Sequence, residues 1–497
     1  MKPVRSHVSP GMRLRYYGLA LVLALLLFWP WLNNYFCSDD WPAILRSVRL
    51  SWPEIPGWFT TLRGGSYRPL HDVFVALCWR LFGLNPLGYR LVSIVLYALV
   101  SANVGVLAHL LTGDGRAGAL STLLFSVFAT HAEPVLWFAA TNELLAGLFV
   151  LLSTTSYVSF RRTGNRWWLV AAGLNGLLGF TSKETALLWP LTLLVYDALW
   201  FEPTGGKKLD GRFIWPALGV VVLWLAFLSF RIPLGSAYTS AVDYGVPRLA
   251  MNLAYYVLIG AFALPNNYAF LAAWPAWQAR PALPIVALVS STTVIAITAW
   301  VWVRERIWAT RRPYRRALLF SCVWMAVALA PIIFIVAERS VFMSSVGIVL
   351  AFCVALAGAW DVAKERGKWM KRAVAVSVVL YVGLNASVLA YRSAWFGRSA
   401  QTSRAVLAQL EGEIERLPAG RPVLLVNLPD HLEYTFTFRN TFPSAARVLG
   451  YDRAVESVLD TALRPLSPRE QEDYIDQRRR APDAAVFWYR DGELVPE

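Results

Sequence analysis

The chain has 497 residues, of which 57% are hydrophobic and only 16% are charged. The apolar residues occur in runs of about 20, the length that spans a bilayer core, which excludes a soluble globular protein. The net charge of +15 does not indicate nucleic-acid binding, because residues 392–497 carry 14 basic and 16 acidic residues and the excess lies in the loops between apolar runs. A cytoplasmic bias of Lys and Arg explains such an excess most simply.

The first apolar run extends from Leu14 to Leu32 behind a basic N-terminus. It is too long for a cleaved signal peptide and lacks a cleavage pattern of small residues, so we interpret it as an uncleaved signal anchor. Positively charged loops stay in the cytoplasm, which predicts a cytoplasmic N-terminus and an outward Asp39-Asp40 pair.

Further spans follow after a long outer loop at residues 34–87. A piece at Leu249–Leu264 leaves a choice: if it crosses, six Arg between 304 and 316 fall outside, against the positive-inside rule. Keeping residues 232–280 outside avoids this and gives about eleven transmembrane helices. The spans read along the chain include about 88–111, 134–159, 167–181, 185–201, 213–231, 317–336, 341–361 and 373–391.

The remaining residues, 392–497, are predicted to form a small extracytoplasmic α+β domain. Val423–Val426 and Ala485–Tyr489 have the pattern of buried strands, the second followed by a turn at Asp491-Gly492. Residues 405–417 have a helical pattern. The chain is thus predicted to comprise an all-α polytopic domain (1–391) and this outer domain (392–497).

Polar residues at the ends of the predicted spans all fall on the outer side, although only Lys and Arg loops were used to orient the chain. Ionisable groups at this depth are costly unless they pair or line a wet cavity, so a shared cavity is predicted. The alternative for each one is a solvated or snorkelling anchor. Glu143 is placed some ten residues into its span, about 15 Å along the helix, facing the bundle interior. The set comprises Asp39, Asp40, Arg68, His71, Asp72, His131, Glu133, Lys183, Glu184, Glu338 and Arg339.

Two chemical roles follow from these residue types. Adjacent carboxylates such as Asp39 and Asp40 offer a general base for an acceptor hydroxyl and a second group that orients a donor or a cation. Arg68, Lys183 and Arg339 would suit a phosphate group at the lipid boundary. Internal ion pairs, Lys183 with Glu184 or Arg339 with Glu338, are the alternative.

Nucleotide-binding loops, dinucleotide fingerprints and zinc spacings are missing from the sequence, so the energy of a reaction would have to arrive with the substrate. No cofactor is called for. A divalent cation is compatible with the acidic pair but is not required, and metal ligands stay unassigned.

Several strings, in order, resemble the GT-C membrane glycosyltransferases, and most of all the O-mannosyltransferase-like branch whose members often carry tetratricopeptide repeats. The resemblance covers about residues 15–395, and the tail has no such repeats. Thr141-Asn142 also replaces an Arg common in that branch, and Ser340-Val341-Phe342 replaces a more aromatic stretch. The matching strings are Cys37-Ser38-Asp39-Asp40-Trp41, Tyr67-Arg68-Pro69-Leu70, residues 83–90, His131-Ala132-Glu133-Pro134-Val135-Leu136-Trp137 with Asn142-Glu143-Leu144, Ser182-Lys183-Glu184-Thr185, and Ala337-Glu338-Arg339-Ser340 with Ser345-Val346-Gly347.

The resemblance implies transfer of a sugar from a polyprenyl-phosphate-linked donor to a periplasmic acceptor hydroxyl, on protein or glycan, at the outer face of a bacterial-type inner membrane. It maps the catalytic carboxylate to Asp39 or Asp40 and a second acidic motif to Glu133. Arg68, Lys183 and Arg339 would bind the donor phosphate. Supporting roles fall to His71, His131, Glu143, Glu184 and Glu338.

A competing hypothesis is a lipid-linked-sugar transporter or a non-catalytic membrane assembly factor, since charged outward cavities also serve translocation. The sequence shows no convincing inverted repeat, which weighs against a transporter.

Overall fold

The computed structural model describes residues 8–48, 51–61, 66–201, 245–269, 278, 280–334, 336–433, 435–451 and 453–497. Within these residues the chain is mostly helical, as predicted, with a four-stranded sheet and a two-stranded ribbon near the C-terminus. The predicted span 213–231 and much of the predicted outer loop 232–280 lie outside them.

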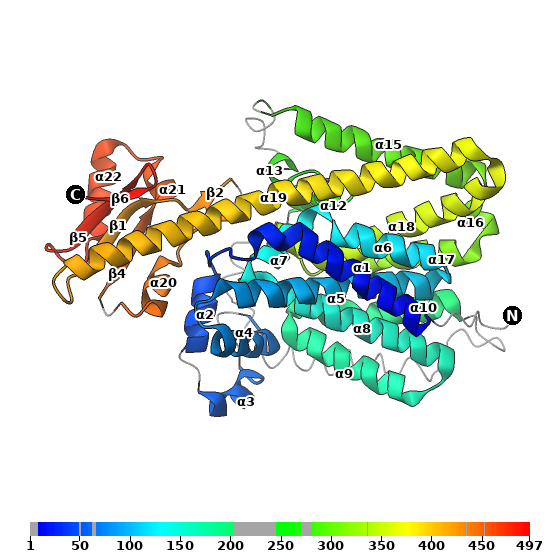
Figure 1. Ribbon diagram of the computed structural model, residues 1–497, viewed down its shortest axis with the longest axis horizontal. Helices are drawn as coiled ribbons and strands as arrows, with labels where there is room; N and C mark the ends of the chain where they lie inside the picture. Colours follow the sequence, from blue (N-terminus) through cyan, green and yellow to red (C-terminus); the bar gives the residue numbers. More distant parts are fainter. Residues whose placement is uncertain are drawn as a thin grey trace.

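The helices of the bundle lie roughly side by side (Figure 1). The longer ones are α1 (Pro10–Phe28), α4 (Pro69–Phe82), α5 (Pro86–Thr112), α6 (Gly115–Ser126), α8 (Thr141–Thr163), α9 (Arg166–Ser182), α10 (Trp189–Trp200), α12 (Val246–Gly260), α15 (Ala282–Arg304), α17 (Arg312–Leu329), α18 (Val341–Arg366) and α19 (Lys368–Arg416). The shorter ones are η1 (Trp29–Trp31), α2 (Asp40–Val48), η2 (Trp52–Glu54), α3 (Ile55–Trp58), η3 (Ala129–His131), α7 (Ala132–Leu136), η4 (Phe138–Ala140), η5 (Glu184–Leu188), α13 (Asn266–Ala269), α16 (Ile307–Thr310) and η8 (Glu338–Ser340).

Local capping residues set the ends of the core helices. Asn85 accepts the backbone N–H of Leu87 at the start of α5, where Pro86 is the first helical residue. Gly113 ends α5 in the left-handed conformation, and Asp114 caps α6 directly afterwards. This short connection makes α5 and α6 antiparallel neighbours.

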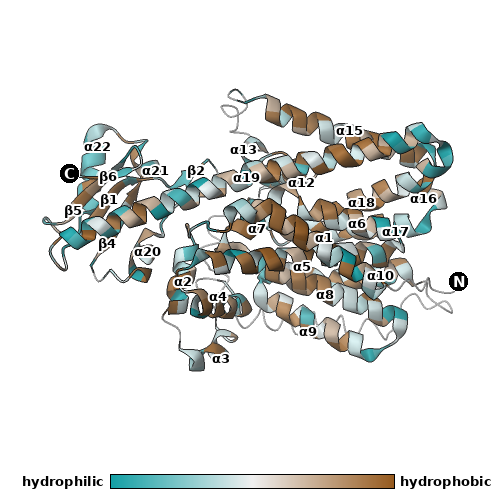
Figure 2. Ribbon diagram, viewed as in Figure 1, coloured by the Kyte–Doolittle hydropathy of each residue, from teal (hydrophilic) through white to brown (hydrophobic). Residues whose placement is uncertain are grey.

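Six helices are long and apolar enough to cross a membrane, or seven if the pair Gly115–Ser126 and Ala129–Leu136, bent by 50°, counts as one span. The predicted number of about eleven is not confirmed within the described residues. Two predicted spans, 167–181 and 185–201, correspond to α9 and α10, which have 17 and 12 residues. Figure 2 shows the apolar bundle and the more hydrophilic C-terminal part.

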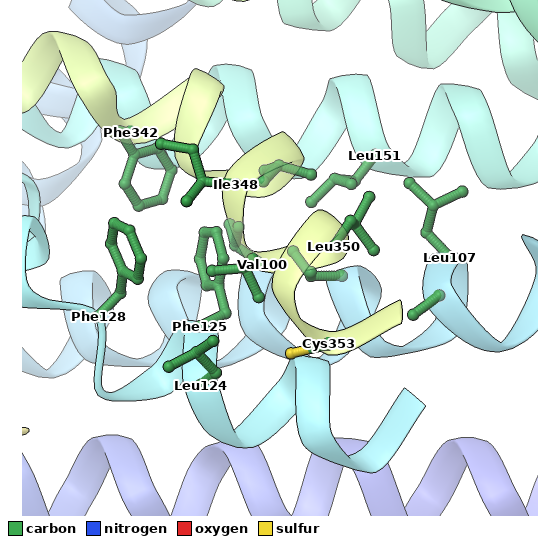
Figure 3. Close-up of a cluster of buried hydrophobic side chains, with 14 of the residues drawn as sticks. Val100, Leu107, Leu124, Phe125, Phe128, Leu151, Phe342, Ile348, Leu350 and Cys353 are labelled. Carbon is green, nitrogen blue, oxygen red and sulfur yellow. The ribbon is translucent and has the colours of Figure 1, made fainter. Parts of the chain in front are cut away.

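The bundle core lies between α5, α6, α8 and α18. In the most apolar windows of α5, α8 and α18, 72%, 78% and 83% of the residues are buried, whereas in α1 only 22% are. Figure 3 shows aromatic and aliphatic side chains of this core, with Phe125 beside Phe342. An apolar outer surface on α1 fits a lipid environment.

The C-terminal sheet has the strand order β4-β1-β5-β6, and its first three strands are parallel. The predicted strands are confirmed as β1 and β5, and the predicted turn joins β5 to β6. Helices α19 and α20 pack on one face of this sheet and α21 and α22 on the other. The elements are β1 (Val423–Leu428), β2 (His431–Leu432), β3 (Thr435–Phe436), α20 (Phe442–Val448), β4 (Val455–Leu459), α21 (Asp460–Leu463), α22 (Pro468–Arg478), β5 (Ala485–Arg490) and β6 (Glu493–Pro496).

Helix α19 joins the two parts of the molecule. It runs without a break for 49 residues, roughly 74 Å, from the far end of the bundle to the sheet (Figure 1). The predicted helix 405–417 is its last part. The division of the chain at residue 391, which stays a prediction, therefore falls inside a helix.

Candidate functional site

Most of the predicted site residues lie at the end of the bundle next to the C-terminal sheet, where α2, α4 and α7 are found (Figure 1) and where η8 contacts α7. We call this the site end. The first turn of α1 and helix α16 lie at the opposite end.

The two adjacent carboxylates have different environments. Asp40 is fully buried at the start of α2, whereas 40% of the Asp39 side chain is exposed. Asp40 accepts hydrogen bonds from the backbone N–H of Ala139 at 2.7 Å and of Cys37 at 3.3 Å. The Arg90 guanidinium lies 3.7 Å from it. Asp40 therefore ties the first loop to the segment before α8, and Asp39 is the accessible member of the pair.

Burial raises the pKa of the Asp40 carboxyl to about 6, although Arg90 and the two backbone N–H groups act to lower it. Arg90 itself donates to the backbone carbonyls of Asn34 and Tyr35. Asp40 and Arg90 thus hold both sides of the turn that carries Asp39.

Glu133 and Arg339 form a second contact across the site end. Glu133 accepts from the backbone N–H of Arg339 and from its Nη1, both at 2.8 Å. The Arg339 guanidinium lies over the Trp137 ring, 4.8 Å from its centroid, and 31% of the side chain is exposed. The Trp137 ring also packs beside Phe436, and Arg439, which lies over the Phe436 ring, is the cation next to Asp39. Glu133 and Arg339 are therefore brought together, and Asp39 is linked to them through Arg439, Phe436 and Trp137.

Two polar side-chain atoms, one under the Arg339 guanidinium and one in the first turn of α8, are buried without a hydrogen-bond partner in the described part of the chain. They are Trp137 Nε1 and Asn142 Oδ1. A buried polar group without a partner is costly, and such groups often mark a place where a ligand supplies the missing bond.

The cations Lys183 and Arg68 are both paired, and the partner of Lys183 is not Glu184, as the sequence alternative proposed. Lys183 Nζ contacts Glu143, and Arg68 binds Glu184 through Nε at 2.9 Å and Nη2 at 2.5 Å. Arg339 likewise pairs with Glu133 rather than with its neighbour. Each ion pair joins different elements, because adjacent residues point away from each other.

The predicted depth of Glu143 is wrong. It lies in the first turn of α8, since that helix begins at Thr141 and not near Pro134. Trp137 adopts an extended conformation (φ −101°, ψ 106°) that separates α7 from the short helix η4. Glu143 therefore lies near the site end, at the level of Lys183.

His71 lies beside these pairs in α4. Its Nε2 is 3.2 Å from Thr141 Oγ1, whose own proton is donated to the Phe138 carbonyl, so His71 Nε2 carries the hydrogen. Burial, together with nearby cations including Arg68, lowers the pKa of His71 to about 3. Burial acts to raise the pKa of Glu184, but Arg68 and Lys183 together outweigh it and hold that pKa at about 2. His71 is thus a neutral positioning group.

Two other predicted site residues, Glu338 and His131, are buried and make internal contacts. Glu338 forms a buried, two-pronged ion pair with Arg392 of α19, at 2.6 Å and 3.3 Å. His131 is not brought to the accessible site, because it is fully buried against Phe125 and bonded to Tyr97 and Ser345.

The C-terminal part contributes contacts that the sequence analysis missed. Arg439 Nη1 lies 3.9 Å from Asp39 Oδ2, the Thr437 carbonyl accepts the Ser38 N–H at 2.8 Å, and the Phe436 ring packs beside Trp137. These residues belong to the chain segment after β1. They lie some 400 residues from Asp39 in sequence, and no local pattern could have indicated this contact.

No group of three or more His, Cys, Asp and Glu in the described residues is arranged to hold a metal ion. The carboxylates of the site end are instead paired with cations.

Known proteins resemble this chain in sequence and in fold. Residues 66–230 match the family described as dolichyl-phosphate-mannose-protein mannosyltransferase. Human protein O-mannosyl-transferase TMTC2 is 31% identical over 204 residues, which cover 38% of this chain and 24% of that protein. Protein O-mannosyl-transferase Tmtc1 of Drosophila melanogaster is 30% identical over 203 residues, 38% of this chain and 23% of that protein. The chain spans about a quarter of the length of these relatives.

A solved structure shows the same fold over most of the chain. The apo form of the Archaeoglobus fulgidus oligosaccharyltransferase aligns with a TM-score of 0.52 and 10% identity, covering 97% of this chain and 70% of that one. At this identity the likeness concerns the fold alone. The family match over residues 66–230 and the similarity to the protein O-mannosyl-transferases confirm the predicted resemblance to the O-mannosyltransferase-like branch of the GT-C proteins.

Proposed function

We propose that the chain transfers a sugar from a polyprenyl-phosphate-linked donor to a hydroxyl group of an acceptor, with Asp39 as the general base. The observation that carries this proposal is the difference between the two acidic side chains: Asp40 is buried and hydrogen-bonded, whereas 40% of the Asp39 side chain is exposed at the site end, beside Arg439. A base must reach the proton that it removes, which only the exposed carboxylate can do without rearrangement.

In the proposed reaction the acceptor oxygen attacks the anomeric carbon of the sugar while Asp39 takes the hydroxyl proton. The bond between that carbon and the phosphate oxygen breaks, and the polyprenyl phosphate leaves with the electron pair. Arg339 is the best-placed group for the developing phosphate charge, because its guanidinium is partly exposed and held by Glu133 and Trp137. Arg68, also partly exposed, is the second candidate.

Lys183 has a different part in this proposal. Only 5% of the residue is exposed and its ammonium is paired with Glu143, so it holds α9 against α8 and shapes the site. We assign the site end to the periplasmic side of a bacterial-type inner membrane, with the N-terminus in the cytoplasm, from the distribution of Lys and Arg. The lipid donor would reach the site from the bilayer, and a protein or glycan acceptor from the periplasm.

The test compares Asp39→Asn with Asp40→Asn in purified protein supplied with a radiolabelled polyprenyl-phosphate mannose and a periplasmic extract as acceptor. We expect Asp39→Asn to lower the rate of transfer by about 10²–10⁴, the usual contribution of a general base, with an unchanged melting temperature. Asp476→Asn, an exposed site on α22, is the matched control.

Release of free polyprenyl phosphate is measured in parallel, because a transporter would move the donor without cleaving it. Unchanged transfer by Asp39→Asn would refute the base assignment. Intact donor after incubation with the wild-type chain, with this and other polyprenyl-phosphate sugars, would refute the transferase proposal itself.

A further inference from the structure

A hollow of about 410 Å³ lies at one edge of the C-terminal sheet. It is formed where the three parallel strands end: β1 contributes Asn427, β4 leads into Asp460 and Arg464, and β5 contributes Tyr489 and Arg490. Its volume lies in the range of small-molecule sites, about 300–1,000 Å³.

The topology of the sheet explains why a hollow forms there. After β1 the chain passes to α20, on the face where Phe442 packs against Val423 and Leu425. After the neighbouring strand β4 it passes to α21 and α22, on the opposite face, where Ile475 packs against Leu424. The two loops therefore diverge at adjacent strand ends. In open α/β sheets such a switch point at the carboxyl ends of the strands is the usual place for a ligand.

The lining is polar and balanced in charge. Asp460 is paired with Arg464, and Arg490 lies over the Trp488 ring at 5.1 Å and is followed by Asp491. The lining thus contains two carboxylates and two guanidinium groups, of which Asp460 and Arg464 form an ion pair. A site for a phosphate or another anion would carry excess positive charge, so the balance favours a neutral ligand with many hydrogen-bonding groups.

The backbone at the rim is fixed in shape. Asn427 and Asp491 both have positive φ values, +65° and +51°, which Asn and Asp tolerate better than most residues. The Asn427 side-chain amide donates to the Tyr489 carbonyl at 3.1 Å and so ties the end of β1 to that of β5. A rigid rim with planar amide, carboxylate and guanidinium groups, next to a phenol ring, suits the hydroxyl groups and apolar faces of a saccharide.

We propose that this hollow binds a neutral saccharide. Its identification as part of the acceptor rests on the proposed function, whereas the binding itself does not. The segment that leaves the hollow after β1 is the one that reaches Asp39 through Arg439. A glycan held by the sheet would therefore be retained at the site end of the molecule.

The test is saturation-transfer-difference NMR on the full-length protein in nanodiscs, without lipid donor. The probes are methyl α-mannopyranoside, maltose and glucose 1-phosphate. We expect signals from at least one neutral sugar, and an affinity at least tenfold lower in Asp491→Asn and Arg490→Gln. Asp491→Asn tolerates the positive φ, so its melting temperature should equal that of the wild type. Asp476→Asn is again the matched control.

Two results would overturn the inference: no neutral sugar binds, or binding is equal in Asp491→Asn and the wild type. Binding of glucose 1-phosphate alone would also contradict it, because it would show an anion site. Donor cleavage separates the two proposals. If the wild type binds a neutral sugar but does not cleave the donor, the saccharide site is supported and the transferase proposal is refuted. If it cleaves the donor but binds no neutral sugar, the transferase proposal is supported and the saccharide site is refuted.

Discussion

Asp39 and Asp40 show how two identical side chains take different roles because of a few backbone contacts. The motif alone could not say which one acts as base, since adjacent residues differ only in the direction in which they point. The structure places Asp40 inward, where two N–H groups and Arg90 compensate its burial. Asp40 is therefore a positioning residue that fixes Asp39.

The burial of Asp40 predicts a pH-dependent stability. Its pKa in the folded protein, about 6, lies above the ordinary value of 3.8, so the folded state binds the proton more tightly than the unfolded state. This contribution to stability is complete below about pH 4 and is lost as the pH rises through 6. The melting temperature of the wild type minus that of Asp40→Asn should accordingly fall between pH 4 and 7 and be constant above it. Differential scanning fluorimetry of both proteins in detergent measures this difference in melting temperature at each pH.

Asp39→Asn is the matched control for this profile, because it changes the neighbouring, exposed carboxylate. A difference curve for Asp40→Asn that is flat from pH 4 to 7, or that rises, would contradict the assignment of a raised pKa to Asp40.

At the scale of elements, hydropathy predicted the helices that lie wholly within the apolar bundle. The runs at 88–111 and 341–361 correspond to α5 and α18, and the apolar pentapeptide Ala485–Tyr489 to β5. It failed where the backbone changes direction inside an apolar run, as at Trp137, because a break in a helix leaves no trace in hydropathy. This error displaced Glu143. Hydropathy also could not show that helix α19 continues past Arg392, because the residues beyond that point are polar although they remain helical.

Gly347, in one of the strings that resemble the GT-C proteins, shows a packing reason for a motif residue. A Cβ there would lie 2.6 Å from the Ser321 carbonyl and 2.8 Å from the Met325 N, both backbone atoms of α17. Gly347→Ala must separate α17 from α18 and should destabilise the protein by about 1–3 kcal/mol, the usual cost of overpacking. A lower melting temperature of the purified variant measures this effect.

Gly383→Ala on α19 is the control, because a Cβ at that position meets nothing within 4 Å. Ala favours a helix over Gly by about 1 kcal/mol, so this variant should be as stable as the wild type or more so. Equal melting temperatures for Gly347→Ala and Gly383→Ala would refute the close contact between α17 and α18.

At the scale of the whole molecule, the C-terminal sheet and the first loop share one hydrophobic core. Phe36, Trp41 and Ile44 of the loop belong to the same buried cluster as Leu425 of β1 and Phe442 of α20. The sequence predicted both parts but not their contact, because no local pattern records which distant surfaces meet. The shared core implies that the sheet stabilises the turn that carries Asp39.

Phe442→Ala tests this dependence. Its ring is fully buried in the shared cluster, and its removal should cost about 3–5 kcal/mol. Because α2 packs on α20, amide hydrogen exchange in Asp40–Val48 should become faster in this variant, as measured by mass spectrometry.

Ile475→Ala is the matched control, since Ile475 is buried on the opposite face of the same sheet. It should speed exchange in α22 and leave α2 protected. Unchanged protection of α2 in Phe442→Ala would mean that the bundle alone holds the first loop. The contact between Arg439 and Asp39 would then not stabilise the turn that carries Asp39.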